Sequence, residues 1–269
     1  MKKILIATDF STSSRNASRY AIELAKEVNA EVYLFNSYKI PNAAPGLNTT
    51  ISRYDIMMQT DKRLLEEADA IDAGRKDIEI ICDEGEPADA ILKLAKEKLV
   101  DFIIVGMKGS GKNFKKIFGS TATALAGNCI VPLIIVPENS KYQSPKVLVY
   151  ASDSIVANST IPAGLKEIIS LFNSKLFVVE VVKEKPADNE AGSISNEGLE
   201  NFPGAMFEYA IDSDINHALH ESITNHSANM LAMVPHKHEW IERLFKKSET
   251  KEMIFHTEVP LLILPESPD

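Results

Sequence analysis

The sequence predicts an α/β protein built from two tandem domains, each a doubly wound sheet of five parallel strands. Short apolar strands alternate with amphipathic helices along the first half of the chain, and the second half repeats the opening and closing segments of the first. The length of 269 residues suits two domains of roughly 130 residues, each large enough for its own hydrophobic core.

The first half begins with a strand that is followed by a helix. Residues 2–9 form an apolar run that ends at Asp9, and the apolar positions of residues 17–28 recur at the spacing of one helix face. Further strands are expected at 30–37, 77–82, 101–105 and 132–137, and further helices at 52–73, 87–98 and 121–128. Such alternation indicates parallel strands with crossover helices on both faces of the sheet.

A glycine-rich stretch follows the fourth predicted strand and carries the most specific signal. It covers residues 105–121, VGMKGSGKNFKKIFGST. Glycines let the backbone turn with positive φ and approach a ligand closely, and successive N–H groups with a helix N-terminus attract anions. The stretch therefore predicts a phosphate site. The alternative is a glycine-rich surface loop with solvated lysines.

Two motifs compete for this stretch. The P-loop pattern G-x4-G-K-(S/T) fits from Gly106 until its last position, where Asn113 replaces the hydroxyl that normally holds Mg²⁺. The pattern G-x2-G-x9-G-(S/T) is met in full by Gly106, Gly109, Gly119 and Ser120. That spacing resembles the nucleotide-binding signature of the universal stress protein family, in its ATP-binding branch.

This resemblance implies that the first domain binds ATP or a related adenine nucleotide, with or without Mg²⁺. It implies that the base lies near Asp9 and Ser37 and that the phosphates lie over the glycine stretch. Asp9 has an alternative role as a helix cap or turn former. The candidate binding residues are Ala7, Thr8, Asp9, Ser37, Gly106, Met107, Lys108, Gly109, Gly119, Ser120 and Thr121.

The strand order decides whether these residues meet. In open α/β sheets, ligands bind outside the carboxyl ends of the strands, where the winding direction reverses. In the order 3-2-1-4-5, which the family resemblance implies, the strands that end at Asp9 and Gly106 are neighbours. Composition alone does not distinguish this order from the flavodoxin-like order 2-1-3-4-5, but the polar and glycine features at the two strand ends favour the former.

The second half repeats the first in outline. Residues 146–154 echo residues 2–10, and residues 259–266 echo residues 131–138. We expect a first domain over residues 1–140 and a second over residues 146–269. This layout resembles that of tandem universal stress proteins.

The second domain departs from the first where the glycine stretch should be. No glycine follows Gly204, and Pro235 stands in the place of Gly106, where it removes a backbone donor and fixes φ. The segment from Lys185 to Gly204 reads as a flexible acidic loop in place of the long second helix. We expect a degenerate domain that does not bind nucleotide in the family's manner.

Charge and composition set further limits. The formal net charge of −9 opposes broad nucleic-acid binding. No apolar run approaches the roughly 20 residues of a membrane span, and the start of the chain lacks the pattern of a signal peptide. We expect a cytoplasmic protein that binds neither nucleic acid nor membranes. Four lysines form a basic island suited to a polyphosphate: Lys108, Lys112, Lys115 and Lys116.

Cysteine and histidine usage indicates little catalytic chemistry. Cys82 and Cys129 read as small buried side chains rather than as a disulfide or a nucleophile. All histidines lie at or after His217, so the first domain cannot form a Ser-His-Asp or Cys-His arrangement. A metal site among these histidines is an alternative to solvated or capping roles.

We therefore expect a binding and signalling module in the stress response. The alternatives are a slow ATPase or phosphotransferase that uses the same pocket, and a nucleotide-free scaffold.

The closing strands suggest why two domains share a chain. Residues 132–137 and 260–265 would each lie at a sheet edge in the order 3-2-1-4-5, which exposes unpaired backbone groups. The family resemblance implies that single-domain members dimerise through this strand. We expect the two strands to pair antiparallel as an internal pseudo-dimer, and a homodimer of the whole chain is a further alternative.

Overall fold

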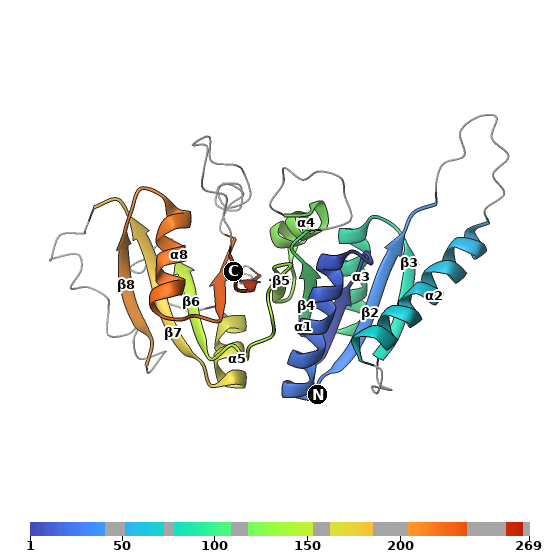
Figure 1. Cartoon of the computed structure of the whole chain (residues 1–269), viewed down its shortest axis with the longest axis horizontal. Helices are drawn as coiled ribbons and strands as arrows, with labels where there is room; N and C mark the ends of the chain where they lie inside the picture. The colour runs from blue at the N-terminus through green and yellow to red at the C-terminus, as the bar shows by residue number, and fades with distance from the viewer. Residues whose placement is uncertain are drawn as a thin grey trace. The chain divides into compact units, whose positions relative to one another are not determined.

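The computed structural model describes residues 1–40, 52–72, 78–108, 118–152, 162–184, 204–235 and 257–265. The chain divides into two compact units (Figure 1). The first unit covers Met1–Phe114 and Phe118–Tyr142, and the second is built mainly from Gln143–Asp269.

The first unit is a parallel sheet with helices on both faces. Its strands are β1 (Lys3–Ala7), β2 (Glu31–Tyr38), β3 (Ile78–Glu84), β4 (Phe102–Gly106) and β5 (Leu133–Val136), and its helices are α1 (Thr12–Val28), α2 (Arg53–Ile71), α3 (Pro87–Lys98) and α4 (Ser120–Asn128). The strand order is β3-β2-β1-β4-β5, and every neighbouring pair is parallel. The predicted order 3-2-1-4-5 is confirmed, and the flavodoxin-like alternative is excluded.

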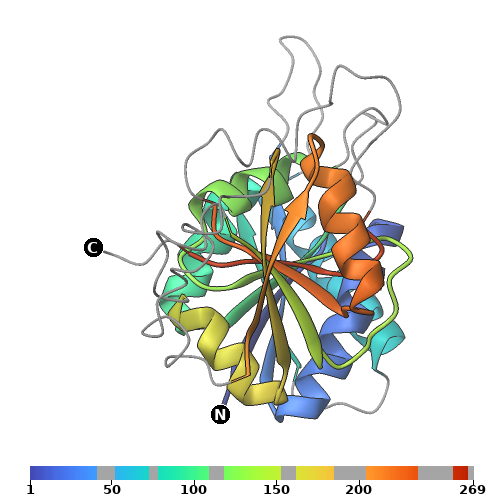
Figure 2. The ribbon, with the colours of Figure 1, turned by 90° about the vertical axis from the view of Figure 1, so that its left-hand side faces the viewer.

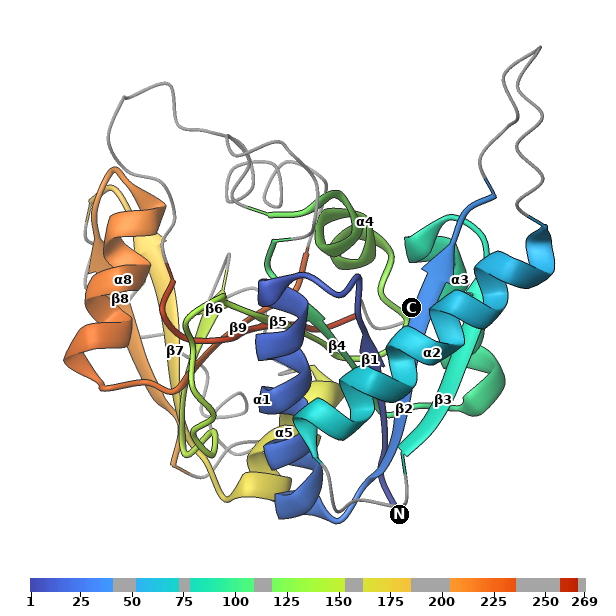
Figure 3. The same ribbon diagram turned by 45° about the vertical axis from the view of Figure 1, so that its right-hand side comes forward.

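The helices of the first unit form two layers. α1 packs beside α2 on one face of the sheet, and α3 packs beside α4 on the other (Figure 3). Three consecutive residues of β1, Ile4, Leu5 and Ile6, are each 0% exposed, so both faces of this strand are covered. A central strand of this kind needs an unbroken apolar run rather than an alternating one.

The second unit repeats this strand order. Its elements are β6 (Val147–Ser152), α5 (Ala163–Phe172), β7 (Lys175–Val182), β8 (Met206–Ile211), α8 (Ile215–Asn225), β9 (Met230–Met233) and β10 (Leu261–Ile263). The order is β8-β7-β6-β9-β10, again with parallel neighbours. Figure 2 shows α5 (yellow) and α8 (orange) on opposite faces of this sheet. The expected loop from Lys185 to Gly204 lies outside the described residues, apart from Gly204 itself.

One hydrogen bond recurs at the same place within each of the two units. In the first, Asp101 Oδ2 accepts a hydrogen bond from Lys3 N at 2.8 Å; in the second, Asn229 Oδ1 accepts one from Val147 N at 3.2 Å. Each acceptor stands directly before the fourth strand of its unit and holds the first strand beside it. The two units therefore share a local anchor as well as a strand order.

The cysteines are less buried than expected. Cys82 and Cys129 are free thiols of intermediate exposure. Cys82 Sγ donates to Asp61 Oδ1 at 3.1 Å, and partial burial together with this carboxylate raises the pKa of the thiol to about 12. Because the thiolate is the reactive form, Cys82 is a poor nucleophile.

No helix of the described ranges is both long enough and apolar enough to cross a membrane.

Leu64 tests which face of α2 packs on the sheet. Its side chain is 0% exposed, whereas that of Leu65 is 57% exposed. Leu64→Ala should lower the free energy of unfolding of the first unit by about 2–5 kcal/mol, because it leaves a cavity. Leu65→Ala is the matched control and should change it by less than about 0.5 kcal/mol. Urea unfolding followed by circular dichroism measures both, and equal effects would contradict this packing.

Candidate functional site

The candidate residues of β1 and β4 meet at the carboxyl ends of these two strands. β1 and β4 are parallel neighbours, and Ala7 lies opposite Val105. Thr8 and Asp9 therefore leave β1 at the level where Gly106 ends β4. The sequence-based expectation that these two strand ends are adjacent is confirmed.

The two ends of the glycine stretch are joined. Gly119 N donates to Met107 O at 2.8 Å, and Met107 N donates to Val136 O at 2.9 Å. Met107 is 6% exposed and uses both backbone groups within the protein. Lys108, in contrast, is exposed. Gly109 and the other residues up to 117, including three of the four lysines of the basic island, lie outside the described residues.

α4 begins where the stretch ends. Its N-cap is Gly119, which supplies no side-chain acceptor to the first turn. Ser120 is exposed and Thr121 is half-buried. The first N–H groups of a helix have no partner within the helix, and they carry partial positive charge. This end of α4 is therefore suited to an anion.

Gly106 has a packing role that the motif did not predict. A Cβ atom at this position would lie 2.8 Å from Ser13 C and 2.9 Å from Ser13 O and Oγ. Only glycine lets the first turn of α1 come this close to the end of β4. Ser13 Oγ then accepts a hydrogen bond from Lys108 N at 3.2 Å. The close approach thus joins the α1 N-terminus to the start of the glycine stretch.

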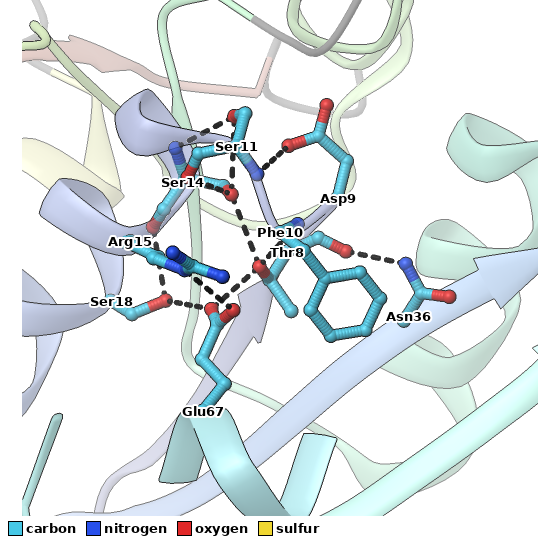
Figure 4. A network of polar contacts seen from close by, with 9 residues as sticks. All are labelled: Thr8, Asp9, Phe10, Ser11, Ser14, Arg15, Ser18, Asn36 and Glu67. Atoms are coloured by element: carbon cyan, nitrogen blue, oxygen red, sulfur yellow. Dashed lines mark hydrogen bonds and ion pairs between the residues drawn. The ribbon is translucent and has the colours of Figure 1, made fainter. Parts of the chain in front are cut away.

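The turn between β1 and α1 is held by its own side chains (Figure 4). Asp9 Oδ1 accepts from Ser11 N at 3.1 Å, which is the turn-forming role considered as an alternative for this aspartate. Ser11 caps α1, because its Oγ accepts from Ser14 N at 3.2 Å. Phe10, which lies between Asp9 and Ser11, has φ 64°. That left-handed conformation is uncommon for a residue other than glycine.

Sequence reasoning proposed Ser37 as a contact of the nucleotide base, which stays a prediction, and the preceding residue, Asn36, contacts the turn after β1. Asn36 is buried, and its Nδ2 donates to Thr8 O at 2.7 Å. Ser37 is half-buried and lies opposite Asp83 of β3 in the strand register. Asn36 was missed because it extends an apolar strand, although a polar residue at the end of such a run is itself a signal.

Glu67 of α2 was also missed. It is 3% exposed, and its Oε1 accepts from Thr8 Oγ1 at 2.6 Å and from Ser18 Oγ at 3.3 Å. Arg15 Nε lies 3.6 Å from Oε2. Among charged helical residues, solvent exposure is the usual expectation. The available signal was spacing, because Thr60, Leu64 and Glu67 share one helix face and are all buried.

The family of this chain follows from its first half. Residues 1–137 match the model of the universal stress protein family. The chain belongs to this family. Universal stress protein MJ0531 of Methanocaldococcus jannaschii is 30% identical over 146 residues, which cover 52% of this chain and 84% of that protein.

A solved universal stress protein has a similar fold. This protein, from Archaeoglobus fulgidus DSM 4304, has a TM-score of 0.69 and 20% identity, and the match covers 98% of each chain. A universal stress protein solved in complex with cAMP is 25% identical over a match that covers 50% of this chain and 96% of that one, with a TM-score of 0.39.

The register corrects the expected equivalence of Pro235 and Gly106 between the two halves of this universal stress protein. Ala7 lies opposite Val105 in the first unit, and the repeat-related Ala151 lies opposite Met233 in the second. The residue that corresponds to Gly106 is therefore Val234, one position before Pro235. Val234 is 6% exposed. The second unit thus carries a buried branched side chain at this point.

Two described histidines of the second unit, His217 and His226, pair with carboxylates. His217 Nδ1 lies 2.6 Å from Asp212 Oδ2, and this contact raises the pKa of His217. Hydrogen bonds from Asp214 N and from His217 lower the pKa of Asp212. His226 stacks on Phe177, with 3.6 Å between ring centroids. Within the described ranges, no group of three or more His, Cys, Asp or Glu residues could hold a metal ion.

Gly106→Ala tests the close approach at the candidate site. It should lower the free energy of unfolding by about 1–3 kcal/mol, because the added Cβ atom meets backbone atoms that must move. Gly127, in α4, is the matched control, since a Cβ atom there meets nothing within 4 Å. Gly127→Ala should be neutral or stabilising by up to about 1 kcal/mol. Chemical denaturation measures both, and a neutral Gly106→Ala would show that the glycine is not needed for packing.

Proposed function

We propose that the first unit of this stress-response protein binds ATP or a related adenine nucleotide, and that the protein acts as a binding and signalling module. The observation that carries the proposal is the convergence of three features at the carboxyl ends of β1 and β4. These are the turn after β1, the end of β4 with Lys108, and the N-terminus of α4. Membership of the universal stress protein family supports the same conclusion.

The residues present fit a nucleotide in their chemistry. The exposed Ser120 hydroxyl and the N–H groups of the first α4 turn suit phosphate oxygens. Lys108 adds a positive charge beside them. Asp9, in the turn after β1, would accept hydrogen bonds from the base or the ribose. Gly109 and Thr121 complete the proposed set from the motif.

The proposal does not include rapid turnover. The first domain has no histidine, and Asn113 stands where a P-loop has the hydroxyl that seats Mg²⁺. The site therefore offers positions for the phosphates but no identified group to activate a water molecule. Occupancy by nucleotide, rather than its hydrolysis, is the proposed signal.

Two glycines separate the competing motifs. Gly109 belongs only to the universal stress protein pattern, and Gly111 belongs only to the P-loop pattern. Isothermal titration calorimetry of the full chain should show ATP binding. Gly109→Val should raise the Kd by at least about tenfold, a loss of roughly 1.4 kcal/mol, because it crowds the close approach of backbone to phosphate. Gly111→Val is the matched control, and its Kd for ATP should be closer to that of the parent.

Three other outcomes would contradict the proposal. An unaltered Gly109→Val with a non-binding Gly111→Val would favour the P-loop. A parent that binds none of ATP, ADP, AMP and cAMP would be a nucleotide-free scaffold. Hydrolysis at roughly 1 s⁻¹ or faster, an ordinary enzymatic rate, would identify an enzyme, provided that Gly109→Val abolishes it and so excludes a contaminating ATPase.

We also propose that the chain forms an internal pseudo-dimer through its closing strands. Within the first unit β5 is the outermost strand, next to β4, and within the second unit β10 is the outermost strand, next to β9. An uncovered edge strand of this apolar composition favours pairing with another strand. The second unit would then cover an edge of the first without binding a ligand itself.

A fragment of residues 1–142 tests this arrangement. It retains Tyr142, whose hydroxyl donates to Glu27 at 2.5 Å and whose ring packs edge-on against Tyr20. The fragment should self-associate, because it lacks the strand proposed to cover β5. The full chain should not self-associate through β5. Sedimentation velocity over a concentration series measures both. A fragment that is folded and monomeric at high concentration would exclude the internal pseudo-dimer.

A further inference from the structure

We propose that Glu67 is a positioning residue for the candidate nucleotide site: from α2, its carboxylate fixes the turn after β1 that carries Asp9. Its effect on binding rests on the proposed function. Its effect on the turn can be measured without any ligand. Glu67 reaches the turn across 59 positions of the sequence.

The burial of Glu67 calls for an explanation. Its carboxylate lies beneath the turn, on the face of α2 that also buries Leu64. A buried carboxylate is unfavourable unless hydrogen bonds or an opposite charge compensate. Oε1 receives the hydrogen bonds of Thr8 and Ser18. Among the described residues, Oε2 has no hydrogen-bond partner, and Arg15 Nε lies 3.6 Å from it. An apolar side chain would fill this position at a lower desolvation cost, but it could not hold Thr8.

The carboxylate determines the direction of the hydrogen bonds. A carboxylate oxygen accepts, and the Thr8 hydroxyl donates its single proton to Oε1 at 2.6 Å. The lone pairs of Thr8 Oγ1 are then oriented to accept from Phe10 N, which lies 3.0 Å away. Phe10 is the residue with φ 64°. Glu67 thereby supports, through Thr8, an uncommon backbone conformation directly after Asp9.

The backbone before Asp9 is held as well. Thr8 N donates to Phe35 O at 2.9 Å, and Thr8 O accepts from Asn36 Nδ2 at 2.7 Å. Asp9 therefore lies between two residues whose positions are set by other elements. Hydrogen-bonded networks in a low dielectric are strong when complete and costly when one member is lost. A change at Glu67 should thus be transmitted to Asp9.

α2 holds the turn at a second point. The guanidinium carbon of Arg63 lies 3.9 Å from the centroid of the Phe10 ring. Arg63 and Glu67 are four positions apart and so lie on the same side of the helix. The two residues therefore hold Phe10 at two points. Arg63 contacts its ring, and Glu67 acts through Thr8 on its N–H group. The position of α2 is therefore coupled to that of the turn.

Glu67→Gln in the full chain is the principal test. The glutamine matches the shape of glutamate, but its neutral amide oxygen accepts the hydrogen bond of Thr8 more weakly than a carboxylate oxygen does. In addition, an NH₂ group in the place of Oε2 would be repelled by Arg15. Hydrogen–deuterium exchange of the ligand-free chain should become at least about tenfold faster for the amides of Phe10, Ser11 and Ser14, since local opening controls their exchange. Glu66→Gln is the matched control, because its side chain is 64% exposed, and its exchange should equal that of the parent.

Thr8 provides a second, independent test. Thr8→Val removes the relay hydroxyl and should accelerate the same amides, whereas Thr8→Ser retains a hydroxyl and should stay closer to the parent. The double variant of Glu67→Gln and Thr8→Val should be no faster than either single variant, because both break one chain of hydrogen bonds. These variants keep the proposal testable if Glu67→Gln does not fold.

Each outcome decides the proposal. Unchanged exchange of the turn in Glu67→Gln, or acceleration spread evenly over the first unit, would overturn it, as would additive effects of the two substitutions. With ATP added, Glu67→Gln should raise the Kd by about tenfold relative to Glu66→Gln, which corresponds to roughly 1.4 kcal/mol. A parent that does not bind ATP would refute the proposed function alone, since the exchange of the ligand-free turn would still decide the role of Glu67.

Discussion

The pairing of β1 with β4 is the constraint on which the candidate site depends. Because the two strands are parallel and Ala7 lies opposite Val105, the polar turn after β1 and the glycine stretch after β4 begin at the same level of the sheet. α1 follows the turn after β1 and approaches the end of β4 so closely that a Cβ atom at Gly106 would meet the backbone of Ser13. The site is thus a consequence of register and of close packing.

Around this pairing, the first unit uses buried polar groups where an apolar core would be simpler. Asn36, Glu67 and Thr8 are all buried, and each contributes to the network at the turn after β1. Such networks define one conformation when every member is paired. This explains how the protein holds Phe10 of this turn in a left-handed backbone conformation. A preorganised turn reduces the free energy that binding must spend on ordering the site.

The second unit preserves the scaffold and changes the site. It repeats the strand order and the acceptor before its fourth strand, where Asn229 takes the part of Asp101. At the position of Gly106, however, it has Val234, and a proline follows directly. A branched side chain prevents the close approach, and proline lacks the N–H group that Met107 donates in the first unit. The fold is therefore retained by features that are separate from those of the site.

The sequence by itself determined the class of the fold and the approximate positions of the strands of the first unit, because buried parallel strands require continuous apolar runs and such runs can be recognised locally. The order of the strands also followed from it, once the glycine spacing had indicated the family. Gly106, Gly119 and Ser120 were found as a motif for the same reason: their spacing is a property of one short segment. The burial of Cys82 was overestimated, since apolar neighbours along a strand do not show how well a sheet edge is covered.

Only the tertiary structure decided the roles of Glu67, Asn36 and Val234. Glu67 is one acidic residue among several on α2, and only its spacing from Thr60 and Leu64 distinguishes it in the sequence from the exposed Glu66. Its function arises from a contact with Thr8 across 59 positions, and the equivalence of Val234 with Gly106 arises from strand register. Contacts of this kind depend on which elements the folded chain places together, and local propensity carries no information about them.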